Sequence, residues 1–288
     1  MATLLQPHLQ EALRRPVEMA WIPGNSGITG AVAMIDAPAD GHSVLVASSS
    51  LLTAHEFLFG DQLPYRPRRD FAPITRIGET AVLLVVPKDK PWADLSALIA
   101  AIRARPGEVK LATSGAGSIG HLVMALLLKR LGLPADAVAY QHHDEGGSFQ
   151  ARAVASGTAD FAIAAATGLL PLIRTGTVRA LATTGKYRAV WTQELTMVPT
   201  VTEAFPQTEL DVDDWWGLVA RSGTPDTAIT AIGAAMGTAL EVPSVRAAMT
   251  ELGTLPVPDP SPADFVRFLE KEFPLRQQMV EASGARLN

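Results

Sequence analysis

The sequence contains no cysteine, which excludes structural disulfides, thiolate nucleophiles and cysteine-based zinc sites. Charged residues make up only 18% of the 288 residues, and the formal net charge is −5 without any run of Lys or Arg. Aromatic residues are also few, at 6%. We therefore expect no nucleic-acid partner, because such proteins combine basic patches with aromatic side chains.

Long hydrophobic runs are missing as well. The longest apolar stretch, residues 161–173, is interrupted by Thr167, Gly168 and Pro171 and is too short to span a bilayer. Residues 1–8 have neither the basic segment nor the apolar segment of a signal peptide. Hydrophobic residues still make up 48% of the chain, which predicts a globular protein with room for two α/β lobes.

Motifs of common enzyme sites are absent, including Gly-x-Ser-x-Gly, a phosphate loop with Lys, and His-Glu-x-x-His. A metal site is one interpretation of three adjacent residues, His142, His143 and Asp144. Neighbouring residues of an extended chain point to opposite sides, and no second ligand cluster accompanies these three, so a solvated loop is favoured. We expect neither a metal nor a cofactor.

The chain does contain a glycine- and serine-rich loop between a strand ending near Thr113 and a helix predicted from His121 to Leu131. Glycines let a ligand approach the backbone, and the first N–H groups of a helix lack intrahelical partners and favour negative charge. The sequence therefore predicts a cradle for a carboxylate or another small anion. The cradle residues are Ser114, Gly115, Ala116, Gly117 and Ser118.

The same loop reads Gly115-x-Gly117-x-x-Gly120, the pattern of a dinucleotide-binding turn. Such a turn belongs to the first strand–helix unit of its fold and needs an acidic residue after the second strand. More than a hundred residues precede this loop, and the nearest acids lie in a polar loop beyond Tyr140. An α/β enzyme that binds a nucleotide or phosphorylated substrate stays an alternative, as does a helix start without a ligand.

A second hydroxyl-rich junction, Ser48, Ser49 and Ser50, follows a strand predicted at residues 43–47. Serine is a good helix N-cap, so capping and ligand contact are both open. Trp216 lies in a strand predicted at 215–220 and belongs either to the core or to the floor of a cleft.

The strands and helices alternate along most of the chain, which predicts an α/β fold. A helix near residues 5–13 comes first, and a strand is predicted at residues 16–22 after it. An α/β lobe that begins with a helix lacks its first strand.

Several motifs together resemble the Bug (TctC-like) receptors of tripartite tricarboxylate transporters, from about residue 5 to the C-terminus. None is specific alone, but six occur in the family's order. They are Pro38-Ala-Asp-Gly41, Leu63-Pro-Tyr65 with Asp70-Phe-Ala-Pro73, the loop at 113–118, Arg179-Ala-Leu-Ala182, Val198-Pro-Thr-Val201, and Trp216-Gly217 with Ser222-Gly-Thr-Pro225.

This resemblance implies a type II periplasmic-binding-protein fold, with two α/β lobes joined by a hinge that the chain crosses twice. The expected lobes are residues 1–86 plus 215–288 and residues 87–214. The implied function is a periplasmic receptor, not an enzyme, that captures a small organic carboxylate and delivers it to the permease subunits of the transporter. We expect a monomer.

The resemblance also assigns ligand contacts to the loop at 114–118 and to the junction at 48–50. The expected ligand-binding residues are Ser48, Ser49, Ser50, Ser114, Gly115, Ala116, Gly117, Ser118, Tyr140, Ala165 and Trp216.

Two departures from the family affect these expectations. Family members begin with a strand that ends in a Pro-Gly-Gly loop, so we expect the reading frame to continue upstream of Met1. The family loop after Tyr140 is shorter and usually has Lys-Gly where this chain has residues 141–144, which leaves the type of ligand open. A cytoplasmic sensor derived from such a receptor is a further alternative.

Overall fold

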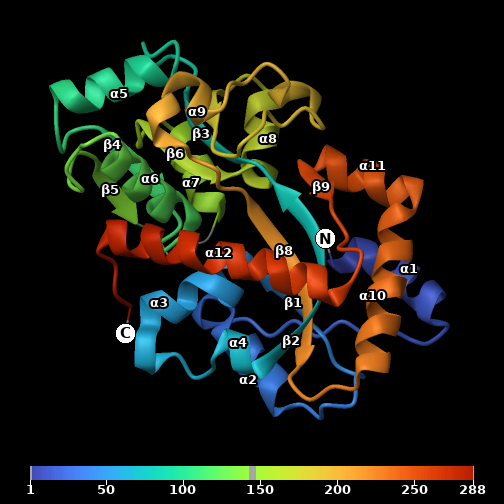
Figure 1. Ribbon diagram of the computed structural model, residues 1–288. Coiled ribbons are helices and arrows are strands. Elements are labelled where there is room, and N and C mark those ends of the chain that lie inside the picture. The colour runs from blue at the N-terminus through green and yellow to red at the C-terminus, as the bar shows by residue number, and fades with distance from the viewer. Residues whose placement is uncertain (1, 143–146, 288) are drawn as a thin grey trace.

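The chain folds into two β-sheets with helices packed around them (Figure 1). The computed structural model describes residues 2–142 and 147–287. In these residues one sheet has four strands in the order β1-β8-β2-β9, and the other has five in the order β5-β4-β6-β3-β7. The strands are β1 (Leu45–Ser48), β2 (Phe71–Thr80), β3 (Val82–Pro87), β4 (Lys110–Thr113), β5 (Ala139–His142), β6 (Phe161–Ala165), β7 (Val178–Thr183), β8 (Asp214–Arg221) and β9 (Thr254–Pro256).

Helices connect these strands and close the chain. They are α1 (Ala2–Leu13), α2 (Ile28–Asp36), α3 (His55–Phe59), α4 (Pro67–Asp70), α5 (Leu95–Ala104), α6 (Ile119–Arg130), α7 (Gly147–Ala155), α8 (Ala166–Arg174), α9 (Val201–Ala204), α10 (Asp226–Glu241), α11 (Pro243–Glu251) and α12 (Pro262–Ser283). Within the described ranges no single helix is long and apolar enough to cross a membrane. Only α10 and α11 together, bent by 75°, meet that test by length and composition.

The local sequence explains why these elements form. The side chain of Asp94 accepts the N–H of Ala97 at 2.8 Å and so caps α5, which buries the apolar face that its periodicity predicts. The aliphatic run Val82–Val86 is fully buried in β3. The elements predicted between residues 43 and 221 are confirmed, with small shifts at their ends.

The strand predicted at residues 16–22 is wrong. This segment has no regular structure and is largely exposed, with Trp21 at 88%. A strand needs a neighbour for its backbone N–H and C=O groups. The backbone of Val17 is held instead by side chains of α1, since its carbonyl accepts from Gln6 at 2.7 Å and its N–H donates to Gln10 at 3.4 Å.

The chain passes from the four-stranded sheet to the five-stranded sheet at residues 80–82 and returns at residues 212–214. These two crossings lie side by side. Thr80 and Asp214 are opposite each other in the β2–β8 pair. Thr184 joins both crossings, since its N–H donates to the Val82 carbonyl at 3.0 Å and its own carbonyl accepts from Val212 at 2.9 Å. A double crossing of this kind is suited to act as a hinge.

Sheet membership suggests a different lobe boundary from the expected one at residue 86. Strand β3 pairs with β6 and β7 in the five-stranded sheet, although the expected division assigned most of β3 to the other lobe. We therefore propose that residues 1–81 with 214–288 form lobe I, around the four-stranded sheet. Residues 82–213 then form lobe II.

Helix α12 ties the two sheets together (Figure 1). Its first turns place Phe265, Leu269 and Phe273 in the core beside the four-stranded sheet. Its last turns place Met279 and Val280 in the large core cluster of lobe II, which also contains the buried face of α6. The helix thus spans both lobes beside the double crossing.

Candidate ligand-binding site

Residues 114–118, here called the cradle loop, leave the end of β4 and enter α6. Gly115 has a φ of +122° and Gly117 a φ of +77°, values that L side chains rarely adopt. A Cβ on Gly117 would lie 2.8 Å from a Cδ atom of Leu58, which precedes the crossings in lobe I. The backbone shape and the close approach of lobe I both require glycine here.

Two backbone N–H groups of the cradle loop are used within the site. The N–H of Gly117 donates to Nδ1 of His121 at 3.0 Å, and the N–H of Ser118 donates to the carbonyl of Gly115 at 3.2 Å. The N–H groups of Gly115 and Ala116 have no partner among the residues that the structure describes. Fewer loop amides are free for a ligand than a bare helix start would offer.

Two buried hydroxyl groups lie at the cradle without a hydrogen-bond partner in the described ranges. They are Oγ of Ser118, the N-cap residue of α6, and Oη of Tyr140 on β5. Burial raises the pKa of Tyr140 to about 12, so its hydroxyl keeps its proton at neutral pH. Buried hydroxyls in folded proteins are nearly always hydrogen-bonded. Each of these two hydroxyl groups therefore retains a donor that no described residue uses.

His121 and His142 complete this side of the site, and neither was among the expected ligand-binding residues. The His121 ring packs edge-on against Tyr140 and His142, with centroids 4.9 and 4.8 Å away. Nδ1 of His142 lies 2.6 Å from Oγ1 of Thr113. Burial, assisted by His142, lowers the pKa of His121 to about 4. His121 is therefore neutral and accepts the Gly117 N–H, which assigns its own proton to Nε2.

Sheet topology brings the ends of β4 and β6 to one edge. The two strands run parallel, so their carboxyl ends lie on the same side. Half-buried Ala165 ends β6 and is the N-cap residue of α8, so α6 and α8 both begin at this edge. A Cβ on Gly120 would lie only 2.2 Å from the carbonyl oxygen of Ile163. Glycine is therefore required at position 120 so that α6 can pack closely on β6, and not so that a ligand can approach the backbone.

The serine junction, residues 48–50, lies at the end of β1. Two of its three hydroxyl groups form hydrogen bonds within the fold. Oγ of Ser48 accepts the N–H of Leu51 at 3.3 Å, as a helix cap does. Ser49 is fully buried and donates to Oδ1 of Asp214 at 2.6 Å. Only Ser50, which is half-buried, has no hydrogen bond from its side chain among the described residues.

The expected residues therefore form two groups on different sheets. Trp216 is half-buried, lies opposite Ser48 in the β1–β8 pair and packs on the lobe I core. Of the cradle loop, Ala116 is exposed and Ser114 is half-buried. His143 and Asp144 of the histidine-rich loop lie outside the described residues. No group of three or more metal-binding side chains is found within the ranges the structure describes.

Comparison with known proteins identifies the protein family of this chain. The model of the tripartite tricarboxylate transporter family receptor, TctC, matches residues 1–285. The chain belongs to this receptor family. BugT from Bordetella pertussis is 29% identical to this receptor over 288 residues, which span 100% of this chain and 85% of BugT.

Two solved structures are similar over nearly their whole length. An R. palustris protein with adipate is 26% identical with a TM-score of 0.87, covering 99% of this receptor and 93% of that chain. MatC from Rhodopseudomonas palustris with bound malate is 28% identical with a TM-score of 0.82, covering 97% and 92%. The expected periplasmic-binding-protein fold is confirmed. The family is a solute-binding receptor, so the alternative of an α/β enzyme is set aside.

Proposed function

We propose that this receptor captures a small organic carboxylate between its lobes and delivers it to the permease subunits of a tripartite tricarboxylate transporter. The observation that carries the proposal is the pair of buried, unpartnered hydroxyls of Ser118 and Tyr140 at the cradle loop. A carboxylate has four lone-pair positions and accepts from such donors.

The electrostatics of the cradle suit an anion held by dipoles. The N-terminus of α6 carries partial positive charge, and its first N–H groups have no intrahelical partner. His121 contributes no formal charge, because its pKa is lowered to about 4 by burial. Recognition therefore depends on hydrogen-bond geometry at Gly115, Ala116 and Ser118 more than on a salt bridge.

The solved relatives support this class of ligand. One is described with adipate and the other with malate, both dicarboxylates, at 26% and 28% identity. The family description supplies the transporter. We propose a periplasmic location, because a receptor that feeds a membrane transporter meets its solute outside the membrane.

The proposed contacts divide between the lobes. In lobe II the ligand meets the cradle loop, with Tyr140 and Ala165 beside it. In lobe I it meets Ser50 and Trp216, while Ser48 and Ser49 shape that surface through the bonds described above. Closure of the lobes brings the two sets together.

Titration calorimetry with malate and adipate, beside NAD and ATP, tests the function. We expect one carboxylate per chain to bind and neither nucleotide to do so. Binding of a nucleotide without any carboxylate would contradict the proposal. Ser118→Ala serves as the site control, because it removes one donor from the cradle and leaves the backbone unchanged.

A further inference from the structure

The segment after α12, residues 284–287, leaves the helix and runs to α3 (Figure 1). It is here called the tail segment. Gly284 ends α12 in the left-handed conformation, with a φ of +62°. Oγ of Ser283 accepts the N–H of Ala285 at 3.1 Å and donates to the carbonyl of Val280 at 2.8 Å. These contacts set the direction in which the chain leaves the helix.

The tail segment is hydrogen-bonded to α3. The N–H of Leu287 donates to the carbonyl of Leu58 at 2.9 Å, and Nη1 of Arg286 donates to the carbonyl of Phe57 at 2.7 Å. Both acceptors belong to the last turn of α3, where carbonyls are open to donors from outside the helix. One backbone bond and one charge-assisted bond therefore fix Arg286 and Leu287 on α3.

The side chain of Leu287 lies against the cradle loop. A Cβ on Gly117 would lie 3.3 Å from a Cδ atom of Leu287, in addition to its 2.8 Å approach to Leu58. Leu58 is a buried member of the core cluster that contains the buried face of α6, and half-buried Leu287 packs on the same cluster. Two leucines, one from α3 and one from the tail segment, therefore support the cradle loop at Gly117.

The cradle loop has few hydrogen bonds of its own. Within the ranges the structure describes, the amides of residues 115–118 form only the two bonds given above, from Gly117 and Ser118. Gly115 and Gly117 both have positive φ, and glycine loses more conformational freedom on ordering than any other residue. A ligand that had to order such a loop would lose affinity, whereas a loop already held in place costs the ligand less.

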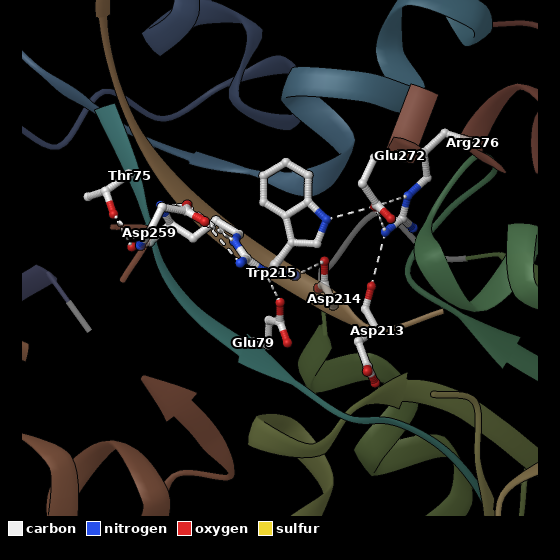
Figure 2. A network of polar contacts seen from close by, with 9 residues as sticks. Thr75, Glu79, Asp213, Asp214, Trp215, Asp259, Glu272 and Arg276 are labelled. Atoms are coloured by element: carbon white, nitrogen blue, oxygen red, sulfur yellow. Dashed lines mark hydrogen bonds and ion pairs between the residues drawn. The ribbon is translucent and has the colours of Figure 1, made fainter. Parts of the chain in front are cut away.

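The tail segment continues a helix that is anchored at the return crossing, residues 212–214 (Figure 2). Nε1 of Trp215 donates to Oε2 of Glu272 at 2.8 Å. Arg276 donates to the same oxygen from Nη2 and Nε at 2.8 and 3.1 Å, and from Nη2 to the carbonyl of Asp213 at 3.0 Å. Arg276 is 1% exposed, so these bonds are shielded from water. The helix that carries Leu287 is thus fixed by bonds in which no residue of the cradle loop takes part.

We propose that the tail segment positions the cradle loop for the anion, and that Leu287 is the positioning residue. Leu287 acts through Gly117 and not by contact with the ligand. Removing its side chain leaves a space beside Gly117, so the loop samples conformations in which the N–H groups of Gly115 and Ala116 turn away from the anion. The anion in this statement rests on the function proposed above, whereas the contact of Leu287 with the loop does not.

Titration calorimetry with malate and adipate measures the effect on binding. Leu287→Ala should weaken affinity by about threefold to tenfold, because the anion then has to order the loop. Leu287→Met keeps an apolar side chain of similar volume and should bring affinity back to near the wild-type value. A loss that Leu287→Met does not repair would contradict a role through packing.

Leu133→Ala is the matched control. Leu133 follows α6, is half-buried and packs on the same core cluster as Leu287, but it lies outside the cradle loop. Urea denaturation should show similar losses of stability in the two alanine variants, whereas only Leu287→Ala should lose affinity. Equal losses of affinity would show a general effect of the damaged core, and wild-type affinity in Leu287→Ala would show that the loop needs no support. Either result overturns the inference.

Amide hydrogen exchange, measured by NMR without any ligand, tests the contact itself. The N–H groups of Gly117 and Ser118 should exchange about threefold to tenfold faster in Leu287→Ala than in wild type, and at the wild-type rate in Leu133→Ala. Wild-type exchange of both amides in Leu287→Ala would make the inference wrong whether or not an anion binds. If exchange accelerates as expected and neither dicarboxylate binds to wild type, Leu287 still positions the loop, and the proposed function fails.

Discussion

The two serine-rich strand ends of this receptor are similar in sequence and differ in what their hydroxyl groups do. At the cradle loop, Ser118 occupies the N-cap of α6, and its buried Oγ has no partner among the described residues. At the serine junction, Ser49 is equally buried, but its Oγ donates to Asp214 at 2.6 Å. The hydroxyl of Ser118 at the cradle loop is thus unused, whereas the hydroxyl of Ser49 joins the serine junction to Asp214 at the start of β8.

In the proposed site, this difference separates residues that bind the ligand from residues that support the fold. A buried donor without a partner is costly in the empty site and is compensated when a ligand accepts from it. A donor that is hydrogen-bonded to a carboxylate is already compensated for its burial. A ligand could accept from it only by displacing that hydrogen bond. Mutations should therefore change binding at the cradle loop and stability at the serine junction.

The largest expected effect is loss of binding in Gly117→Val. Its φ of +77° and the 2.8 Å approach of Leu58 both exclude a side chain. Backbone strain of about 1–3 kcal/mol, added to the collision, should weaken carboxylate affinity by about a hundredfold or more. The far-UV circular dichroism spectrum should stay unchanged.

Gly132→Val is the matched control for that variant. Gly132 has a φ of +66°, but nothing lies within 4 Å of an added Cβ. It carries a similar backbone strain without the collision at the cradle, so calorimetry should show wild-type affinity. Full affinity in Gly117→Val would remove the cradle loop from the site.

His121 gives the cradle a pH dependence of its own. Burial lowers the pKa of His121 from 6.5 to about 4. Between these values the unfolded chain binds more protons at this residue than the folded protein, so stability falls as the pH falls. The full contribution is about 3 kcal/mol of unfolding free energy at pH 4.

Urea denaturation of wild type and His121→Asn, at about pH 7 and at about pH 4.5, isolates this contribution. Asparagine keeps an acceptor for the Gly117 N–H but does not titrate, so the variant should lose less stability on acidification. Both proteins share the contributions of His55, which has the same sign, and of Asp213, which has the opposite sign. Identical losses would show that His121 is protonated without cost to the cradle.

Ser118→Ala should weaken binding more moderately. One hydrogen bond to a charged acceptor contributes about 1.5–3 kcal/mol, which corresponds to about a 10- to 150-fold loss of affinity. Removing an unpartnered buried hydroxyl should leave the melting temperature unchanged or raise it slightly. Calorimetry and thermal unfolding on the same sample give both values. Wild-type affinity would mean that the ligand does not accept from Oγ.

The sequence predicted most of the strands and helices, because their signals are local. The continuous aliphatic run of β3 and the amphipathic pattern of α5 each specify one element. Residues 16–22 show the limit of this approach, since an apolar pattern does not supply the neighbouring strand that a ladder needs.

The candidate site was only partly predictable for a similar reason. The glycines and Ser118 could be predicted because the loop and the start of the helix are contiguous in the sequence. The Ser49–Asp214 bond joins residues 165 positions apart, so no local pattern could show that this hydroxyl is occupied. His121 could have been found, since it follows the glycine loop directly and lies in the first turn of α6.

Ser49→Ala should give the smallest effect on binding and decides whether the two strand ends differ as described. The substitution removes one of the two hydrogen bonds to the buried Asp214 carboxylate, leaving the bond from the Trp215 N–H. Loss of a bond to a buried charged group costs about 1–3 kcal/mol of unfolding free energy. Affinity for malate or adipate should change less than about twofold, because Ser49 does not face the ligand in the proposed site. Urea denaturation together with calorimetry makes the comparison with Ser118→Ala direct. A variant of unchanged stability and strongly reduced affinity would show that the serine junction also holds its hydroxyl for the ligand.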